Sequence, residues 1–414
     1  MRVVKRAILF LTFLVIALIV WTCTREEPIE EGRCRLKFKA LSKHDDMLVA
    51  LAMQDLTGTR DKPSEIKDLP KGLTTDCVYF LAEVVGKSTP MVLAYYNRLE
   101  YSILYMDTNG DCRLSDEKPY RPKIKKRHSY KEYVFGPFLL KSQESEGGCQ
   151  VEFYATTTHG QHLSLKPSGY RFGKVRLGKN AYKLAVMDGN FDGRYDKVFS
   201  LPVQKTYRVG CDIFAIDLNN GDKMWHLSLI NRSEIMPLGR MVKVQNAYYG
   251  IDVAPDGTTL ELKKVEPQFG TLDFNGANAK LKLWSDTGDH YLFGSEGHWQ
   301  LPAAKYMALR IELSQIDSEQ NVWTFSGRPK AGPLRDFEIR AGQTISFKTG
   351  PPFSIKTDIR QSANRVSIGL NLEGCAQEQY RFPILKGGKR QPAPTFKIVD
   401  ESGKELLSGA FEYG

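Results

Sequence analysis

The chain lacks the short motifs that mark the common enzyme classes. It contains no HExxH, Gly-x-Ser-x-Gly or Walker sequence, so nothing in it indicates zinc-protease, serine-hydrolase or P-loop chemistry. Its cysteines form no CxxC pair, which argues against a zinc cluster. Apart from residues 46–55, no segment after the N-terminus has helical character. These absences favour a β-rich protein without a recognisable catalytic centre.

The chain also has no strong excess of positive or negative charge. The 58 basic and 48 acidic residues leave a formal charge of +10 on 414 residues. The densest basic cluster, residues 121–128, has no interleaved aromatic residues that could stack on bases, so we expect a solvated loop and no nucleic-acid partner. The modest excess leaves room for anionic partners such as acidic glycans or lipid headgroups.

Residues 1–23 are typical of an export signal. Arg2, Lys5 and Arg6 precede a nearly unbroken apolar run of 15 residues, Ala7 to Trp21. That run is shorter than the roughly 20 residues of a spanning helix. Its end, Val-Trp-Thr-Cys23, resembles a bacterial lipobox, which implies lipidation at Cys23. A lipoprotein and an uncleaved anchor both stay open, and either places the body outside the cytoplasmic membrane, in the periplasm or at the cell surface.

Six cysteines remain after Cys23. An even number in an exported chain allows up to three disulfides, and we expect at least one bridged pair in the N-terminal half. Free, buried cysteines are the alternative. The six residues are Cys34, Cys77, Cys112, Cys149, Cys211 and Cys375.

Short runs of β-prone residues, separated by turn clusters, dominate the rest of the chain. Val78–Val85, Tyr101–Met106 and Tyr182–Met187 are examples that alternate apolar and polar residues or are continuously apolar. The pattern predicts a mostly β protein, built from several antiparallel sandwiches and hairpins with little helix beyond the N-terminal segment.

Changes in composition divide the chain. We expect a tether at residues 24–33, a β-rich region at 34–265, a sandwich at 266–350 and a small C-terminal β module at 351–414. Gly297–Tyr306 resembles a hairpin of carboxypeptidase-regulatory-like, transthyretin-like sandwiches, although Ala304 stands where that family has glycine. Asp400-Glu-Ser-Gly403 predicts a tight turn in the last module.

Two loops carry oxygen side chains at alternate positions, the pattern that wraps a calcium ion when the backbone curls. Each follows a predicted strand rather than a helix. In the second loop the expected ligands at positions one, three, five, seven and nine are Asp188, Asn190, Asp192, the Arg194 carbonyl and Asp196. Gly193 occupies position six, and Phe199 stands at position twelve in place of the bidentate glutamate of an EF-hand.

The first loop lies 81 residues upstream and matches less fully. Cys112 replaces the glycine, and Glu117 comes one residue before position twelve. The expected ligands are Asp107, Asn109, Asp111, the Arg113 carbonyl and Glu117. A third segment, Asp217 to Asp222, is a degraded copy that predicts only a turn.

The loops resemble the half-motifs of dockerins and thrombospondin-type repeats, and of exported bacterial β-rich proteins with Asp-x-Asn-x-Asp-Gly loops. That resemblance implies weak, structural Ca²⁺ sites and no reaction. The alternative is that the loops are Asx turns, in which the side chains bond their own backbone.

The first hypothesis for function is therefore a non-catalytic, membrane-anchored envelope protein with structural calcium loops, engaged in surface structure or ligand binding. A carbohydrate-active or carbohydrate-binding protein is the alternative, with glycans or other envelope components as partners. Trp284, Trp299 and Trp323 could stack on sugars, but their alternation on predicted strands favours burial. His159 and His162 are more typical of surface residues than of a metal pair.

Overall fold

The structure is a computed structural model that describes residues 30–42, 45–73, 76–96, 98–127, 129–141, 150–201, 210–218, 225, 233–274, 278–294, 297–362 and 365–412. Strands make up 59% of the chain and helix 2%, which confirms the predicted mostly β class. No helix among these residues is long and apolar enough to cross a membrane. The N-terminal segment with Cys23 lies outside them.

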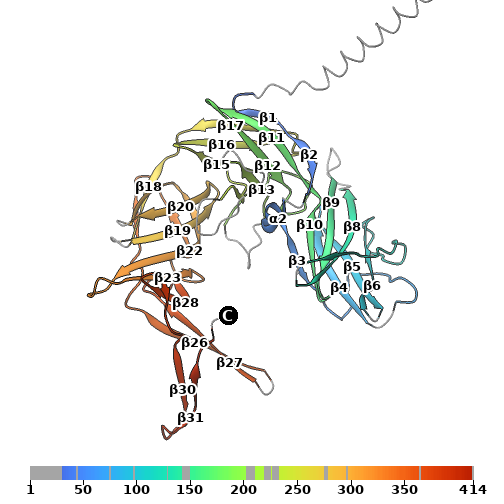
Figure 1. Cartoon of the computed structure of the whole chain (residues 1–414). Helices are drawn as coiled ribbons and strands as arrows, with labels where there is room; N and C mark the ends of the chain where they lie inside the picture. Colours follow the sequence, from blue (N-terminus) through green and yellow to red (C-terminus); the bar gives the residue numbers. More distant parts are fainter. Residues whose placement is uncertain are drawn as a thin grey trace, which may run out of the picture.

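Three β modules follow one another around an arch, and a C-terminal arm projects from its end (Figure 1). The first module comprises residues 54–167. The second combines residues 33–40 with residues 169–265, so the first module is inserted into it. The third comprises residues 269–390.

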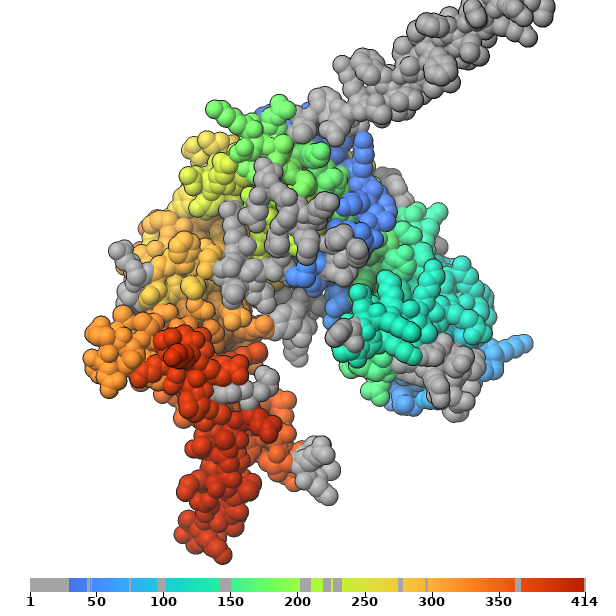
Figure 2. Space-filling model, in the orientation of Figure 1, coloured from blue at the N-terminus to red at the C-terminus, as the bar shows by residue number. Residues whose placement is uncertain are grey.

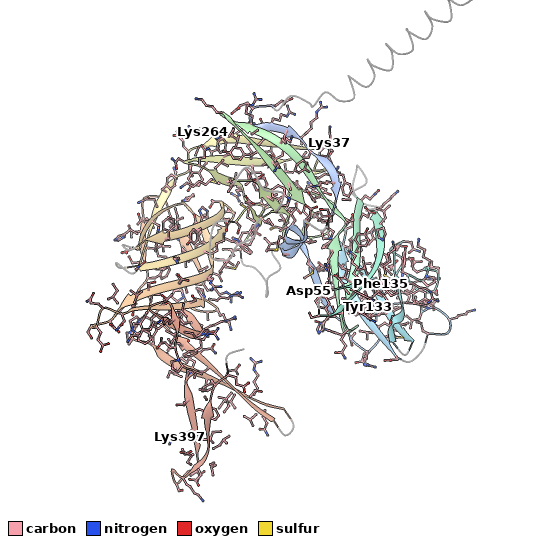
Figure 3. The ribbon with its side chains drawn as sticks, viewed as in Figure 1. Lys37, Asp55, Tyr133, Phe135, Lys264 and Lys397 are labelled. Carbon is pink, nitrogen blue, oxygen red and sulfur yellow. The ribbon has the colours of Figure 1, made fainter. Side chains whose placement is uncertain are left out.

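The first module is a sandwich of two antiparallel sheets. Its three-stranded sheet consists of β4 (Cys77–Val84), β5 (Lys87–Tyr96) and β6 (Arg98–Met106). The facing sheet has the order β3 (Gln54–Thr57), β10 (His162–Pro167), β9 (Gln150–Thr157), β8 (Lys131–Lys141) and β7 (Lys123–Lys126). Side chains of both sheets, including buried Tyr133 and Phe135, fill the core between them (Figure 3).

The second module pairs strands from distant parts of the sequence. One sheet has the order β14 (Ile235–Pro237), β13 (Ile213–Ile216), β12 (Asn180–Met187), β11 (Gly169–Leu177) and β2 (Lys37–Ala40). The other has the order β1 (Arg33–Arg35), β17 (Thr259–Val265), β16 (Ala247–Val253) and β15 (Met241–Val244). An apolar core that includes Leu36, Leu184 and Leu262 lies between them.

The one helix among the described residues, α2 (Asp46–Ala52), joins the first two modules. It contacts β10 of the first module and β13 and β14 of the second. The expected helical segment, residues 46–55, thus ends at Met53, whose extended backbone leads into β3.

The third module is a sandwich of a three-stranded and a nine-stranded sheet. The smaller sheet has the order β21 (His298–Pro302), β18 (Phe269–Asp273) and β25 (Thr344–Ser346). The larger runs through β20 (Gly288–Gly294), β19 (Asn278–Ser285), β22 (Ala304–Ile316), β23 (Val322–Arg328), β28 (Gln379–Lys386), β27 (Arg365–Glu373) and β26 (Ser354–Ser362). β24 (Asp336–Ile339) and β29 (Lys389–Arg390) are added beside β22 and β28.

The large sheet runs across the expected boundary between residues 350 and 351. Because β28 pairs with β23, the C-terminal residues up to 390 belong to the third module rather than to a module of their own. The β26–β27 hairpin and the separate hairpin of β30 (Thr395–Val399) and β31 (Glu405–Ala410) form the projecting arm, with Lys397 on the latter (Figures 2 and 3). Asp400 to Gly403 makes the predicted tight turn.

Gly297–Tyr306 is not a hairpin, and that expectation is wrong. β21 pairs with β18 in the small sheet, whereas β22 pairs with β19, β23 and β24 in the large one. The chain therefore crosses between the two sheets at Ala303. The buried Tyr306 hydroxyl donates to the Pro302 carbonyl at 2.6 Å, which fixes this crossing.

The expected disulfide is also missing from the described residues. Among the described residues, none of Cys34, Cys77, Cys112, Cys211 and Cys375 is joined in a disulfide. Three of them lie in separate apolar cores, so the fold keeps their sulfur atoms apart. Cys149 lies outside the described residues.

Candidate metal centre

The second Asp/Asn loop begins directly after the buried strand β12. Asp188 is 6% exposed, and its two carboxylate oxygens accept the N–H groups of Asp192 at 3.2 Å and Gly193 at 2.9 Å. Phe191 and Gly193 have φ values of 60° and 81°. The carboxylate thus sits inside a curled backbone, and two left-handed residues produce the curl.

The first loop, which follows β6, has the same conformation. Asp107 is 2% exposed and accepts the N–H groups of Gly110 at 2.7 Å and Cys112 at 2.9 Å. Its left-handed residues are Gly110 (φ 80°) and Cys112 (φ 65°), again at positions four and six. Cys112 therefore adopts a conformation that costs a non-glycine residue about 1–2 kcal/mol. Both loops thus have left-handed residues at positions four and six. Glycine occupies position four in the first loop and position six in the second.

Further side-chain oxygens in both loops bond the backbone two residues on. Asp192 accepts the N–H of Arg194 at 2.8 Å, and Asn109 accepts the N–H of Asp111 at 3.0 Å. Asp111 in turn accepts the N–H of Arg113 at 2.7 Å. These are Asx turns, the predicted alternative, and both loops are flanked by strands on their N-terminal side as expected.

The outer residues of the two expected ligand sets have partners of their own. Asp196 receives two hydrogen bonds from the Arg194 guanidinium, at 3.0 and 2.7 Å. Glu117 accepts the Thr108 N–H at 2.5 Å and its hydroxyl at 2.7 Å, so it closes the first loop. The inner residues Asp188, Asn190 and Asp192, by contrast, gather at the start of the second loop.

A second buried carboxylate, Asp212, lies beside the second loop. Met187 of β12 pairs with Ile213 of β13, and the same antiparallel register places Asp188 opposite Asp212. Asp212 is fully buried and accepts the N–H groups of Gly189 at 3.2 Å and Lys197 at 2.7 Å. No spacing in the sequence reveals this residue, since only strand pairing brings it to the loop.

The electrostatics of this group of acids favour a cation. Burial raises the pKa of the Asp188 carboxyl to about 7, and the charge of Asp192 adds to the effect. Burial and the charge of Asp188 likewise raise the pKa of Asp212 well above its usual value. Two facing carboxylates that both resist ionisation would be stabilised by a bound positive charge.

Asn190 contributes an oxygen without a hydrogen-bond partner. Its Nδ2 donates to Asp192 at 2.7 Å, while its Oδ1 is buried and accepts no hydrogen bond. An unsatisfied buried carbonyl oxygen costs about 1–3 kcal/mol. Oxygen ligands from carboxylates and amides suit a hard divalent cation such as Ca²⁺.

A cavity of about 500 Å³ adjoins the loop where the first two modules meet. The Arg171 guanidinium lies over the Tyr195 ring at 5.3 Å, and its Nε is buried without a hydrogen-bond partner. Burial raises the pKa of Tyr195 to about 12, so its hydroxyl stays protonated and can donate. The cavity offers one cation among several acids, and its lining includes Phe38, Glu152, Arg171, Asp188, Tyr195 and Asp256.

The remaining candidate residues do not gather into a site. His159 and His162 contact each other edge to face at 5.3 Å and are exposed. Trp284 is 5% exposed in an apolar core, and Trp299 and Trp323 pack against another. Within the described ranges, no three His, Cys, Asp or Glu side chains form a group that could hold a metal. Asn219 to Asp222 of the third segment lies outside those ranges.

No protein-family model, curated protein or solved structure matches this chain.

Proposed function

We propose that this protein is a non-catalytic, exported and membrane-anchored β-protein in which the second loop holds Ca²⁺ as a structural clip. Its role is in surface structure or ligand binding. The observation that supports the clip is the oxygen set of the loop. It combines the buried Asp188 carboxylate with a buried Asn190 Oδ1 that has no hydrogen-bond partner.

The side chains of Asp188, Asn190 and Asp192 and the carbonyl of Arg194 would hold the ion. Bound Ca²⁺ supplies positive charge among carboxylates that otherwise repel one another. The chain's own contribution is to preorganise the oxygens, because backbone N–H groups already fix the Asp188 carboxylate. In the first loop the corresponding groups are the side chains of Asp107, Asn109 and Asp111 and the carbonyl of Arg113, and Glu117 is the further carboxylate expected there.

Phe191, at position four of the second loop, gives the clip a structural consequence. Its side chain is 1% exposed and packs in the core of the first module, with its ring 5.8 Å from that of Phe153. Its carbonyl accepts the Val85 N–H at 2.6 Å. The loop follows β12 and so belongs to the second module. An ordered loop therefore keeps Phe191 in the core of the first module and holds the two modules together.

Calcium titration of the full chain in detergent tests the clip. Exported modules with few carboxylate ligands bind Ca²⁺ with a Kd of about 10⁻⁴–10⁻³ M. At 10 mM Ca²⁺ and a Kd of ~1 mM the stabilisation is about 1.4 kcal/mol, which raises Tm by roughly 3–6 °C. We expect this shift in the parent and none in the Asp188→Asn, Asp192→Asn double variant.

Asp400→Asn is the matched control, because Asp400 also makes an Asx turn, accepting the Ser402 N–H at 2.9 Å, but in a turn without the alternating oxygen set. It should keep the calcium response of the parent. A parent chain whose Tm does not change at millimolar Ca²⁺, or a double variant that still responds, would show that the loop is only an Asx turn.

Membrane anchoring has its own test. Cell fractionation should place the parent chain in the membrane fraction, facing outward, and a labelled fatty acid should enter the parent but not Cys23→Ser. Membrane association without any label would favour the uncleaved anchor. Recovery of the parent in the cytoplasmic fraction would contradict export.

A further inference from the structure

The β26–β27 hairpin of the arm has one apolar and one charged face. Their antiparallel register brings Ile355, Ile359, Val366, Ile368, Leu370 and Leu372 to the same face. Ile355, Ile359 and Val366 are 67%, 66% and 60% exposed, so this part of the face is open to solvent, whereas Leu372 packs against the core of the third module. The opposite face carries Lys356, Asp358 and Arg360. There Arg360 pairs with Asp358 at 2.6 Å and Lys356 with Glu373 at 3.6 Å.

β26 is also the last strand of the nine-stranded sheet. Among the described strands it pairs only with β27, so its outer edge is free along nine residues. A long, exposed strand edge with apolar side chains is a template for pairing with another strand. Because the hairpin projects from the body of the molecule, a second chain can approach this edge (Figure 2).

A comparison with β7 shows that β26 is not protected against its own copy. β7 is likewise a fully exposed edge strand, but its charges, on Lys123, Lys125 and Lys126, have one sign. Two copies of β7 would therefore repel each other. β26 instead alternates positive and negative charges on its polar face, so a copy of itself can be complementary.

The charges select the register of such a pair. Residues of one face must oppose residues of the same face, so only every second register is compatible. Centring on Asp358 would oppose Lys356 to the partner's Arg360 and Asp358 to the partner's Asp358, which are like charges. Centring on Thr357 opposes Lys356 to the partner's Asp358 and Ile355 to the partner's Ile359, and the two-fold axis repeats both pairs.

A third register, centred on Ile359, opposes Asp358 to the partner's Arg360. It would oppose Ile355 to residue 363 of the partner, which lies outside β26, so Ile355 would gain no partner from the paired strand. The Thr357-centred register is the one in which both exposed isoleucines gain apolar partners and the charges are opposite.

We propose that β26 pairs with β26 of a second copy of this chain, antiparallel and centred on Thr357, so that two large sheets continue into one. This contact is isologous, with a two-fold axis that closes the assembly as a dimer. The apolar faces of the two hairpins then form one continuous surface.

Charge exchange tests the pairing by sedimentation velocity of the full chain in detergent. Lys356→Glu and Asp358→Lys each turn two opposite-charge pairs into like-charge pairs. Each should weaken association about tenfold, which corresponds to ~1.4 kcal/mol. The double variant restores opposite charges and should recover the parent's dimer. A monomeric parent at tens of micromolar, or a double variant no better than the singles, would overturn the proposal.

Cysteine cross-linking tests the register in a Cys375→Ser background, which removes the exposed native thiol. Thr357→Cys should form a covalent dimer under mild oxidation, because directly opposed residues have Cβ atoms within disulfide range. Asp358→Cys should not. Dimers from Asp358→Cys instead, or none from either variant, would contradict the Thr357-centred pair. A monomer that binds anionic vesicles, and loses binding in Ile359→Glu, would assign the apolar face to a lipid surface.

Discussion

Phe191 provides the sharpest test of how the modules are joined. It is a large aromatic residue with a φ of 60°, buried in a module to which its own strand does not belong. Phe191→Ala should destabilise the first module by about 3–5 kcal/mol, the range found when a buried phenylalanine is truncated. The left-handed backbone strain of about 1–2 kcal/mol is common to phenylalanine and alanine and cancels between them.

For Phe191→Gly and Phe191→Ala we expect the reverse of the usual order of destabilisation. Gly usually destabilises more than Ala, but at this φ it relieves the strain, so Phe191→Gly should lose about 1–2 kcal/mol less than Phe191→Ala. Phe293→Ala is the control, since that side chain is 68% exposed and its truncation should change stability by under ~0.5 kcal/mol.

The measurement must report on the first module alone. All five tryptophans lie outside residues 54–167, so their fluorescence does not follow this module. Hydrogen exchange of peptides from β4, β5 and β9, measured by mass spectrometry, gives the free energy of opening there. A loss below ~1 kcal/mol in Phe191→Ala would refute the interpretation that this side chain docks the two modules, and a larger loss in Phe191→Gly than in Phe191→Ala would refute the strain argument.

Three further predictions concern charge and thiols. Lys282→Ala should cost about 3–5 kcal/mol in urea unfolding, because it removes the ion pair between Lys282 and the buried Asp289 carboxylate. Lys280→Ala breaks an exposed pair with Glu312 and should cost at most ~1 kcal/mol; similar losses in the two variants would contradict this. Burial alone would raise the pKa of the Glu132 carboxyl, but hydrogen bonds and charge from Lys166 and Arg127 lower this pKa overall. Ionised Glu132 therefore stabilises the folded state above the pKa that Glu132 has in the unfolded chain, and this contribution is lost as the pH falls through the pKa of the folded state. Glu132→Gln should therefore lower Tm at pH 7 and progressively less below pH ~4, and a gap that widens on acidification would refute the sign. Among the described cysteines, Cys375 is exposed and should react with iodoacetamide in the folded chain, while burial raises the pKa of Cys34 to about 12 and should protect it; equal labelling by mass spectrometry would exclude this arrangement.

Local features of the fold could be predicted from the sequence. Tyr182–Met187 lies within β12, and Tyr101–Met106 lies within β6, because residue alternation and turn chemistry act over a few residues. Pairings between distant segments could not be predicted. Arg33–Arg35 pairs with Glu261–Thr259, and nothing in either short segment specifies a partner so far along the chain.

The candidate site divides in the same way. The Asp188 loop could be recognised because its oxygens recur at fixed, short spacings. Asp212 and Arg171 could not, since they reach the loop only through the pairing of β12 with β13 and β11. The docking of Phe191 could not be predicted either, because the residues around position four of the loop do not indicate which core an aromatic side chain there will enter.

The insertion of the first module also sets an order of events during synthesis. A chain made from its N-terminus releases β1 and β2 first, yet the strands that pair with them, β17 and β11, come only later. The first module can fold in the meantime, and the last large side chain of its core, Phe191, arrives soon after β10. Until residue 265 emerges, β1 lacks its partner strand, so the second module must close late, around a neighbour that is already folded.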